Sequence, residues 1–300
     1  MDERPEIYRL ADGAQLAYRV LNRTSNTLPL VLVNGWSSIM SDWEQPSAFA
    51  STLASARPVL VYDHRGIGDS AFADPGGDDM TIESMARDLL ALLSHIGWQQ
   101  LALCGSSTGG AVAQQLLLLP HHPQKPTPLP FPVERVILAA SMASTVPKVD
   151  TKEGRLESAR RVVEVTFDSL WYNDPANAQR VEQWAKQFAE PRQKQALIAQ
   201  TKATSNVNFG DLHAQLPRHI QFLVIHGTLD RFVAYFHSVE IMRKIPWARR
   251  VEIGSGRGQI DHCQFGHQWY GYFDAQRWRD VFDVFLDGQA EETKDKKAKL

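Results

Sequence analysis

The sequence predicts an α/β fold built on a mostly parallel, doubly wound sheet. Short apolar runs alternate with segments of helical periodicity, which is the pattern of strands joined by crossover helices. Several of these runs are apolar throughout, as expected of strands that are covered on both faces. The 300 residues, of which 43% are hydrophobic, are sufficient for a sizeable core.

The first elements are predicted from turn and capping signals. Asp12-Gly13 favours a turn between antiparallel strands at 7–10 and 15–20. Thr81 can cap a helix that ends at Gly97. The apolar runs that predict the remaining strands are 29–33, 58–62, 101–104, 136–140, 221–225 and 250–253, and an amphipathic helix closes the fold at 273–286.

One long stretch breaks the alternation of strands and helices. Between 141 and 218 no strong strand pattern occurs, and helices are predicted at 157–171, 176–188 and 192–202. We interpret this stretch as a helical lid inserted into a core. The predicted units are the core at 1–140 and 219–288, the lid at 141–218 and a disordered charged tail at 289–300. The proline-rich segment 120–130 is expected to be an extended surface loop.

Composition and charge exclude several classes of partner. The net charge of −2 provides no field that would attract nucleic acid or an anionic membrane. No apolar run approaches the roughly 20 residues that span a bilayer, and the polar N-terminus lacks the apolar core of a secretory signal. Two cysteines, Cys104 and Cys263, do not suggest a disulfide framework, so a reducing intracellular compartment fits best.

The sequence Gly105-Ser106-Ser107-Thr108-Gly109 lies between a predicted strand and a predicted helix. Glycines at its two ends remove Cβ atoms that would clash in a sharp turn, which leaves the Ser107 hydroxyl exposed at the apex. This context predicts a nucleophile elbow with Ser107 as the covalent nucleophile.

A serine nucleophile needs donors for the oxyanion that develops on the substrate. Asn34-Gly35-Trp36-Ser37 follows directly after the strand at 29–33, and Gly35 allows the backbone to approach the substrate closely. The backbone N–H of Trp36 is therefore a candidate donor. The N–H of Thr108, the residue after the nucleophile, is the second.

The acid and the base that would assist the serine are expected in loops that follow later strands. Asp230 lies in a turn just after the strand at 221–225, and the order serine, aspartate, histidine favours it as the acid. Two histidines follow the last predicted strand, His262 and His267. We favour His267 as the base because a glycine precedes it and the closing helix follows shortly after. His262 is the alternative.

These motifs together resemble the α/β-hydrolase superfamily, over residues 7–286. The segment Asp63–Ser70 looks like a structural turn of the family, His226-Gly227 with Asp230 resembles its acid-bearing turn, and Gly266-His267 resembles its Gly-His pair. The loop before His267 is longer than usual, because Gly256-Arg257-Gly258 stands where the pair normally occurs.

The resemblance implies a lidded serine hydrolase, esterase- or lactonase-like, that needs no metal and no organic cofactor. A carboxylic ester, lactone or thioester is the expected small-molecule substrate. Ser107 disfavours the relatives with an aspartate nucleophile, the epoxide hydrolases and haloalkane dehalogenases. The alternatives are a carbon–carbon bond hydrolase of a diketone and a ligand-binding protein with little turnover. Candidate residues for an apolar acyl pocket, or else for plain core, are Trp36, Trp43, Met142, Phe167 and Trp171.

The last three residues, Ala298-Lys299-Leu300, are a near variant of the Ser-Lys-Leu peroxisomal address. They predict recognition by a peroxisomal import receptor and a peroxisomal location. The alternative is an ordinary charged tail on a cytoplasmic protein.

Overall fold

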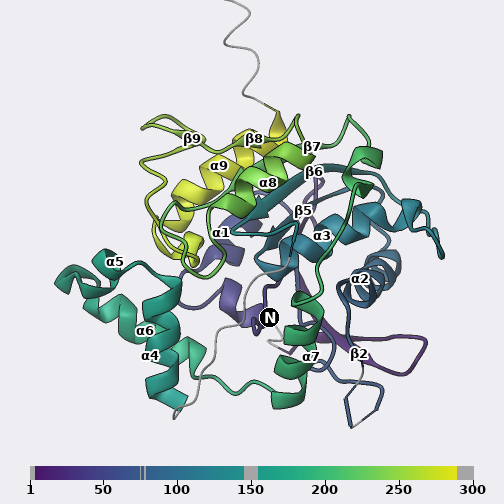
Figure 1. Cartoon of the computed structure of the whole chain (residues 1–300), viewed down its shortest axis with the longest axis horizontal. Coiled ribbons are helices and arrows are strands. Elements are labelled where there is room, and N and C mark those ends of the chain that lie inside the picture. Colours follow the sequence, from purple (N-terminus) through teal and green to yellow (C-terminus); the bar gives the residue numbers. More distant parts are fainter. Residues whose placement is uncertain (1–3, 75, 78, 145–154, 289–300) are drawn as a thin grey trace, which may run out of the picture.

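Eight strands form one sheet in the computed structural model, which describes residues 4–74, 76–77, 79–144 and 155–288 (Figure 1). Their order is β1-β2-β4-β3-β5-β6-β7-β8. β2 is antiparallel to both β1 and β4, and the other neighbours are parallel. The strands are β1 (Glu6–Arg9), β2 (Gln15–Leu21), β3 (Leu30–Val33), β4 (Val59–Tyr62), β5 (Leu101–Ser106), β6 (Val133–Ala139), β7 (Gln221–Ile225) and β8 (Arg249–Arg250). The predicted fold class is confirmed.

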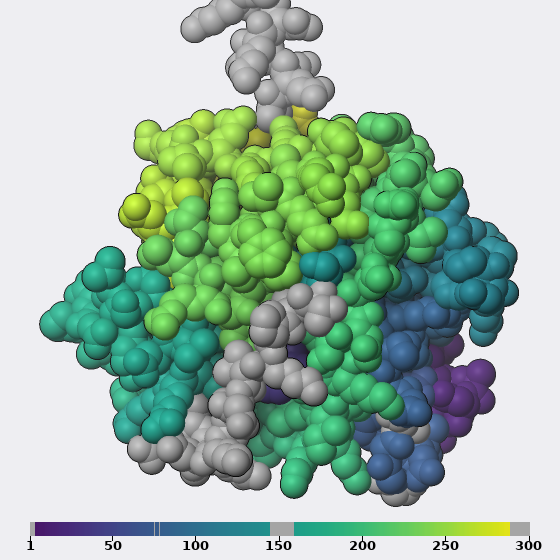
Figure 2. All heavy atoms as spheres, in the orientation of Figure 1, coloured from purple at the N-terminus to yellow at the C-terminus, as the bar shows by residue number. Residues whose placement is uncertain are grey.

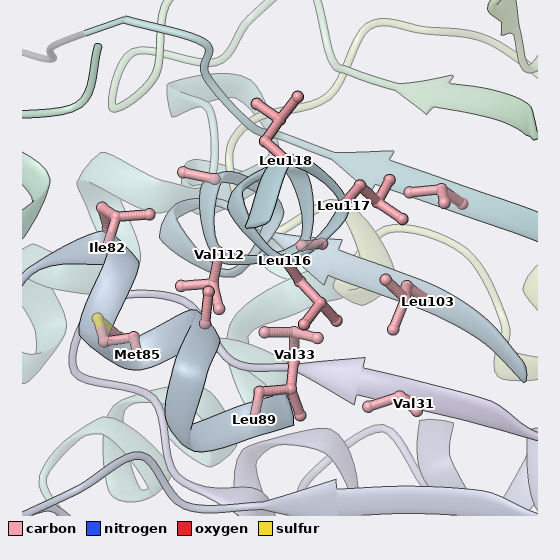
Figure 3. Close-up of a cluster of buried hydrophobic side chains, with 14 of the residues drawn as sticks. Val31, Val33, Ile82, Met85, Leu89, Leu103, Val112, Leu116, Leu117 and Leu118 are labelled. Carbon is pink, nitrogen blue, oxygen red and sulfur yellow. The ribbon is translucent and has the colours of Figure 1, made fainter. Parts of the chain in front are cut away.

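Successive residues of the central strands belong to two different cores, one on each face of the sheet. In β3, Val31 and Val33 pack on the face that α2, α3 and α8 cover, as Figure 3 shows for α2 and α3. Leu30 and Leu32 pack on the face that α1 and α9 cover. This is why the strands are apolar throughout. The helices are α1 (Phe49–Ala54), α2 (Ile82–Ile96), α3 (Thr108–Leu118), α8 (Phe236–Lys244) and α9 (Ala275–Asp287).

The strand predicted at 250–253 is wrong as a single element. β8 pairs with β7, and Val251 N still donates to Val224 O at 3.1 Å. Glu252 and Ile253 are exposed and form β9 (Glu252–Ile253), which pairs with β10 (Gln259–Ile260) in a separate two-stranded sheet. The main sheet therefore ends where the side chains turn to solvent.

The helix predicted at 157–171 is also wrong as a single element. The structure has α4 (Arg155–Thr166) and α5 (Ser169–Asn173), because Asp168 begins a new helix. Its Oδ1 accepts the N–H groups of Leu170 and Trp171 at 2.9 and 3.1 Å, which is an N-terminal cap.

The later helices of the insertion are confirmed with small shifts, as α6 (Ala178–Phe188) and α7 (Lys194–Thr204). α4, α5 and α6 pack on one another and project as a lobe at one side of the molecule, whereas α7 lies apart from them (Figure 2). The insertion is thus a lobe plus a separate helix.

Two further sequence predictions concern the loop and the tail. After a 3₁₀ turn at Leu119–His121, the segment through Pro130 contains no helix or strand, as predicted. Ala298, Lys299 and Leu300 lie outside the described residues, so the import signal stays a prediction. No helix within the described part of the chain is long and apolar enough to cross a bilayer.

His213 is a buried histidine that links α3 to the segment before β7. Its Nε2 donates to Gln114 Oε1 at 2.9 Å, and burial, aided by the charge of Lys244, lowers its pKa to about 4. The unfolded chain therefore binds more protons between pH 6.5 and pH 4, so the free energy of unfolding falls as pH falls through this window.

We expect His213→Gln to reduce this acid destabilisation. The loss of unfolding free energy between pH 7.5 and pH 4.5 should be about 2–3 kcal/mol smaller in the variant than in the unaltered protein. Urea denaturation at the two pH values measures it. Replacing the exposed His219 by glutamine is the control, and an equal change in both variants would contradict the assignment.

Candidate active site

Ser107 occupies a strained turn between β5 and α3. Its φ is 55° and its ψ is −124°, a left-handed conformation that is costly for a residue with a Cβ. The turn is held by the end of β6, since Ser107 N donates to Ala139 O at 2.9 Å and Ser141 Oγ donates to Ser107 O at 2.8 Å. This is the geometry of a nucleophile elbow.

Two glycines make the elbow possible by close packing. A Cβ on Gly105 would lie 2.4 Å from Gly109 O, and a Cβ on Gly109 would lie 2.1 Å from Val33 O. α3 therefore begins in direct contact with the end of β3, which brings Ser107 beside the segment that follows β3.

That segment, Asn34–Ser37, is the predicted oxyanion turn, and its first residue is tied to the core on both sides. Asn34 Nδ2 donates to Tyr62 O at 2.7 Å, and the Trp43 indole N–H donates to Asn34 Oδ1. His64 Nε2 donates to Asn34 O at 3.0 Å, and burial lowers the pKa of His64 to about 4. A neutral histidine in the turn Asp63–Ser70 thus fixes the first residue of the predicted oxyanion turn.

The turn lies directly against the nucleophile. A Cβ on Gly35 would stand 3.1 Å from Ser107 Cβ and 3.7 Å from Ser107 Oγ. Ser37 N donates to Gln200 Oε1 and Ser38 N to Gly35 O. By contrast, the N–H groups of Trp36 and Thr108 donate to no acceptor within the described residues. Both predicted oxyanion donors are therefore without an acceptor in the described part of the chain.

Asp230 is buried in the turn after β7, and both of its carboxylate oxygens have partners. Oδ1 accepts the N–H groups of Phe232 and Val233 at 2.9 and 2.8 Å. Oδ2 lies 2.8 Å from His267 Nδ1 and 3.2 Å from His226 Nε2. Burial alone would raise the pKa of Asp230, but the charges and hydrogen bonds of the two histidines outweigh it and lower the pKa below its usual range.

Of the two candidate bases, the structure joins only His267 to Asp230. The contact fixes the tautomer, because Nδ1–H donates to the carboxylate and Nε2 is left as an acceptor. His262 is exposed, and its ring packs on Phe273 with centroids 5.1 Å apart. The carboxylate is thus paired with the histidine that the Gly-His motif favours.

The lengthened loop reaches the site because it is bonded to the turn after β7. Thr228 N donates to Cys263 O at 2.8 Å and Leu229 N to Phe265 O at 3.1 Å. Beyond His267, the Trp269 indole N–H donates to Ser106 Oγ at 3.1 Å. The histidine is therefore held between the acid turn and the residue that precedes the nucleophile.

Within the described residues, neither Ser107 Oγ nor His267 Nε2 has a hydrogen-bond partner. Hydrogen bonds between a nucleophile and its base are commonly long in the absence of substrate and tighten in the complex. Neither atom is therefore engaged by another group of the described chain.

The aromatic residues considered for an acyl pocket mostly serve the core. Trp43, Met142 and Phe167 are at most 5% exposed and pack among other apolar side chains. Trp36 and Trp171 are half-buried. A pocket of about 290 Å³ lies between α5 and the turn after β7, lined by Asp168, Ser169, Leu170, Thr228, Leu229, Asp230 and Arg231. It touches neither Ser107 nor His267.

The described part of the chain contains no cluster of three or more histidine, cysteine, aspartate or glutamate side chains arranged to hold a metal ion. Two contacts of the site are not predicted from the sequence. His226 is named there as part of the acid-bearing turn but not as a second histidine on Asp230, and Gln200 of α7 is not named at all. His226 stands four residues before Asp230, a spacing that could have suggested the contact. No local signal marks Gln200, which lies 163 residues from its partner Ser37.

Comparisons with known proteins identify the family and the fold. The sequence matches the family described as alpha/beta hydrolase fold over residues 29–260. A solved hydrolase from Pseudomonas aeruginosa PA01 is 26% identical with a TM-score of 0.71, covering 95% of this chain and 99% of that chain. The enol-lactonase from Burkholderia xenovorans LB400 is 22% identical with a TM-score of 0.69, covering 94% and 100%, and shares the fold.

A proline iminopeptidase from Lactobacillus crispatus (strain ST1) is 26% identical over 132 residues, 44% of this chain and 42% of that protein. The chain thus matches less than half the length of this curated relative. Since the family match covers most of the chain, the protein belongs to the alpha/beta hydrolase fold family, a family of hydrolases.

Proposed function

We propose that the protein is a serine hydrolase that cleaves a carboxylic ester, lactone or thioester through an acyl-enzyme on Ser107. The observation that carries the proposal is the 2.8 Å contact between His267 Nδ1 and Asp230 Oδ2, held beside the elbow. A buried, ionised aspartate stabilises the imidazolium that forms when the histidine accepts the proton of the serine.

The reaction proceeds in two halves. Ser107 Oγ attacks the carbonyl carbon and gives its proton to His267 Nε2, while the N–H groups of Trp36 and Thr108 bind the oxyanion. The bond to the leaving group breaks, and His267 protonates that group. Water then attacks the acyl-enzyme, again losing its proton to His267, and releases the acid and the free serine.

The insertion is proposed to be the lid of this site, since it contacts both of its sides. On one side, Tyr272 OH, shortly after His267, donates to Asp168 Oδ2 at 2.7 Å. On the other side, the Trp36 indole N–H donates to Thr201 Oγ1 of α7 at 3.0 Å. A substrate would therefore be enclosed between the lobe, α7 and the sheet.

Labelling with a serine-directed fluorophosphonate tests the mechanism. The unaltered protein should take up one probe per chain, and Ser107→Ala should take up none, as measured by intact mass. Ser55→Ala is the control, because its exposed hydroxyl donates to Thr52 O, contacts none of the site residues and should leave labelling intact. Failure of the unaltered protein to label, or equal labelling of Ser107→Ala, would reject the acyl-enzyme.

A further inference from the structure

One face of α7 is bonded to both residues that carry the proposed oxyanion donors. Leu197 and Thr201 lie four residues apart and therefore share a helix face. Leu197 O and Thr201 Oγ1 accept the Trp36 indole N–H at 3.3 and 3.0 Å. Thr204 Oγ1 lies 3.2 Å from Thr108 Oγ1. α7 therefore contacts the side chains of both residues whose backbone N–H groups are the proposed oxyanion donors.

Gln200 lies on the same face between these contacts, and its side chain is fully buried. Its Oε1 accepts Ser37 N–H at 2.8 Å. Ser37 has a φ of 62°, and its carbonyl accepts Arg192 Nε–H at 2.9 Å. Ser37, which follows Trp36, is therefore held in a left-handed conformation by one hydrogen bond to its N–H and another to its carbonyl.

This contact fixes the orientation of the Gln200 carboxamide. A backbone N–H needs an acceptor, so the oxygen must face Ser37 and Nε2 must present two donors elsewhere. Nε2 is buried and has no partner within the described residues. Buried donors almost always have partners in folded proteins, so this donor is free to bond a group that enters the candidate site.

We propose that Gln200 is a third donor to the oxyanion, through its side-chain Nε2. The inference rests on the proposed function, because it needs a carbonyl substrate on Ser107. Gln200 Oε1 is bonded to Ser37, which adjoins Trp36, and Gln200 O accepts Thr204 Oγ1–H, whose oxygen contacts Thr108. Gln200 therefore lies on the side of α7 that faces both residues with a proposed backbone donor. The negative charge that develops on the carbonyl oxygen would supply the acceptor that Nε2 lacks.

Two variants separate a donor from a residue that only positions the turn. Gln200→Glu keeps an oxygen for Ser37 N–H but replaces the Nε2 donor by a second acceptor, and Gln200→Met removes both. With 4-nitrophenyl butanoate, we expect both variants to lower kcat on the order of 10²–10³-fold with little change in KM. Binding of a trifluoromethyl ketone analogue should weaken by the same factor as kcat/KM.

A purely positioning role predicts a different result, in which Gln200→Glu stays near the unaltered activity and only Gln200→Met loses it. That outcome would overturn the proposal, as would unchanged kcat in both variants. Gln195→Glu, at an exposed position of the same helix, is the control, and thermal unfolding checks that each variant folds. If the unaltered protein neither labels at Ser107 nor hydrolyses the ester, the proposed function itself fails.

Discussion

His267→Ala should lower kcat/KM for ester hydrolysis on the order of 10⁴–10⁶-fold, whereas His262→Ala should leave it within about threefold. Of these two histidines, only His267 is hydrogen-bonded to Asp230, so only its loss removes both the proton acceptor and the imidazolium that the carboxylate would stabilise. His262 is exposed and contacts Phe273, away from the carboxylate. The five-residue separation makes the two variants a closely matched pair.

Steady-state kinetics with 4-nitrophenyl butanoate measures this difference. The rate of fluorophosphonate labelling of Ser107 should fall in parallel, because the same histidine activates the serine for the probe. Circular dichroism should show that both variants fold. A large loss in His262→Ala with little loss in His267→Ala would reverse the assignment of the base.

Gly109→Ala should destabilise the protein by about 4 kcal/mol or more, so that little folded protein is recovered. The added Cβ would lie 2.1 Å from Val33 O and 2.5 Å from Asn34 O, both of which are backbone atoms that no rotamer change can move. Since these atoms belong to the end of β3 and the start of the oxyanion turn, any relief would displace the site as well.

Gly97→Ala is the matched control for this prediction. Gly97 ends α2 with a φ of 76°, and a Cβ there would meet nothing within 4 Å. Only the left-handed conformation opposes the change, at a cost of about 1–2 kcal/mol. Urea denaturation compares the two variants, and equal destabilisation would show that close packing at the elbow is not what requires Gly109.

Much of the fold could be predicted because its signals are local. An apolar run such as 221–225 is enough to predict a buried strand. Thr81 and Gly97 are enough to predict the two ends of a helix. The two predicted elements that the structure divides, the helix at 157–171 and the strand at 250–253, are interrupted by contacts with distant residues or by exposure to solvent. Asp168 divides a helical pattern because its side chain caps a new helix and accepts Tyr272 OH. The segment at 250–253 leaves the sheet because its later residues face solvent.

Some residues of the candidate site could likewise be predicted from local signals, and others could not. The elbow, the acid turn and the oxyanion turn each follow a strand, so their residues could be named from the order of the chain alone. The choice between His262 and His267 could not, because both follow the last strand. It depends on two backbone hydrogen bonds that Thr228 and Leu229 make to the lengthened loop.

By itself, the sequence determined the α/β sheet, the sharp turn at Ser107 and the place of Asp230 after a core strand, because strand burial and sharp turns depend on adjacent residues. Only the tertiary structure decided that His267 meets Asp230 and that Gln200 meets Ser37. These pairs are separated by 37 and 163 residues, so their contact depends on how loops and helices pack on the finished sheet.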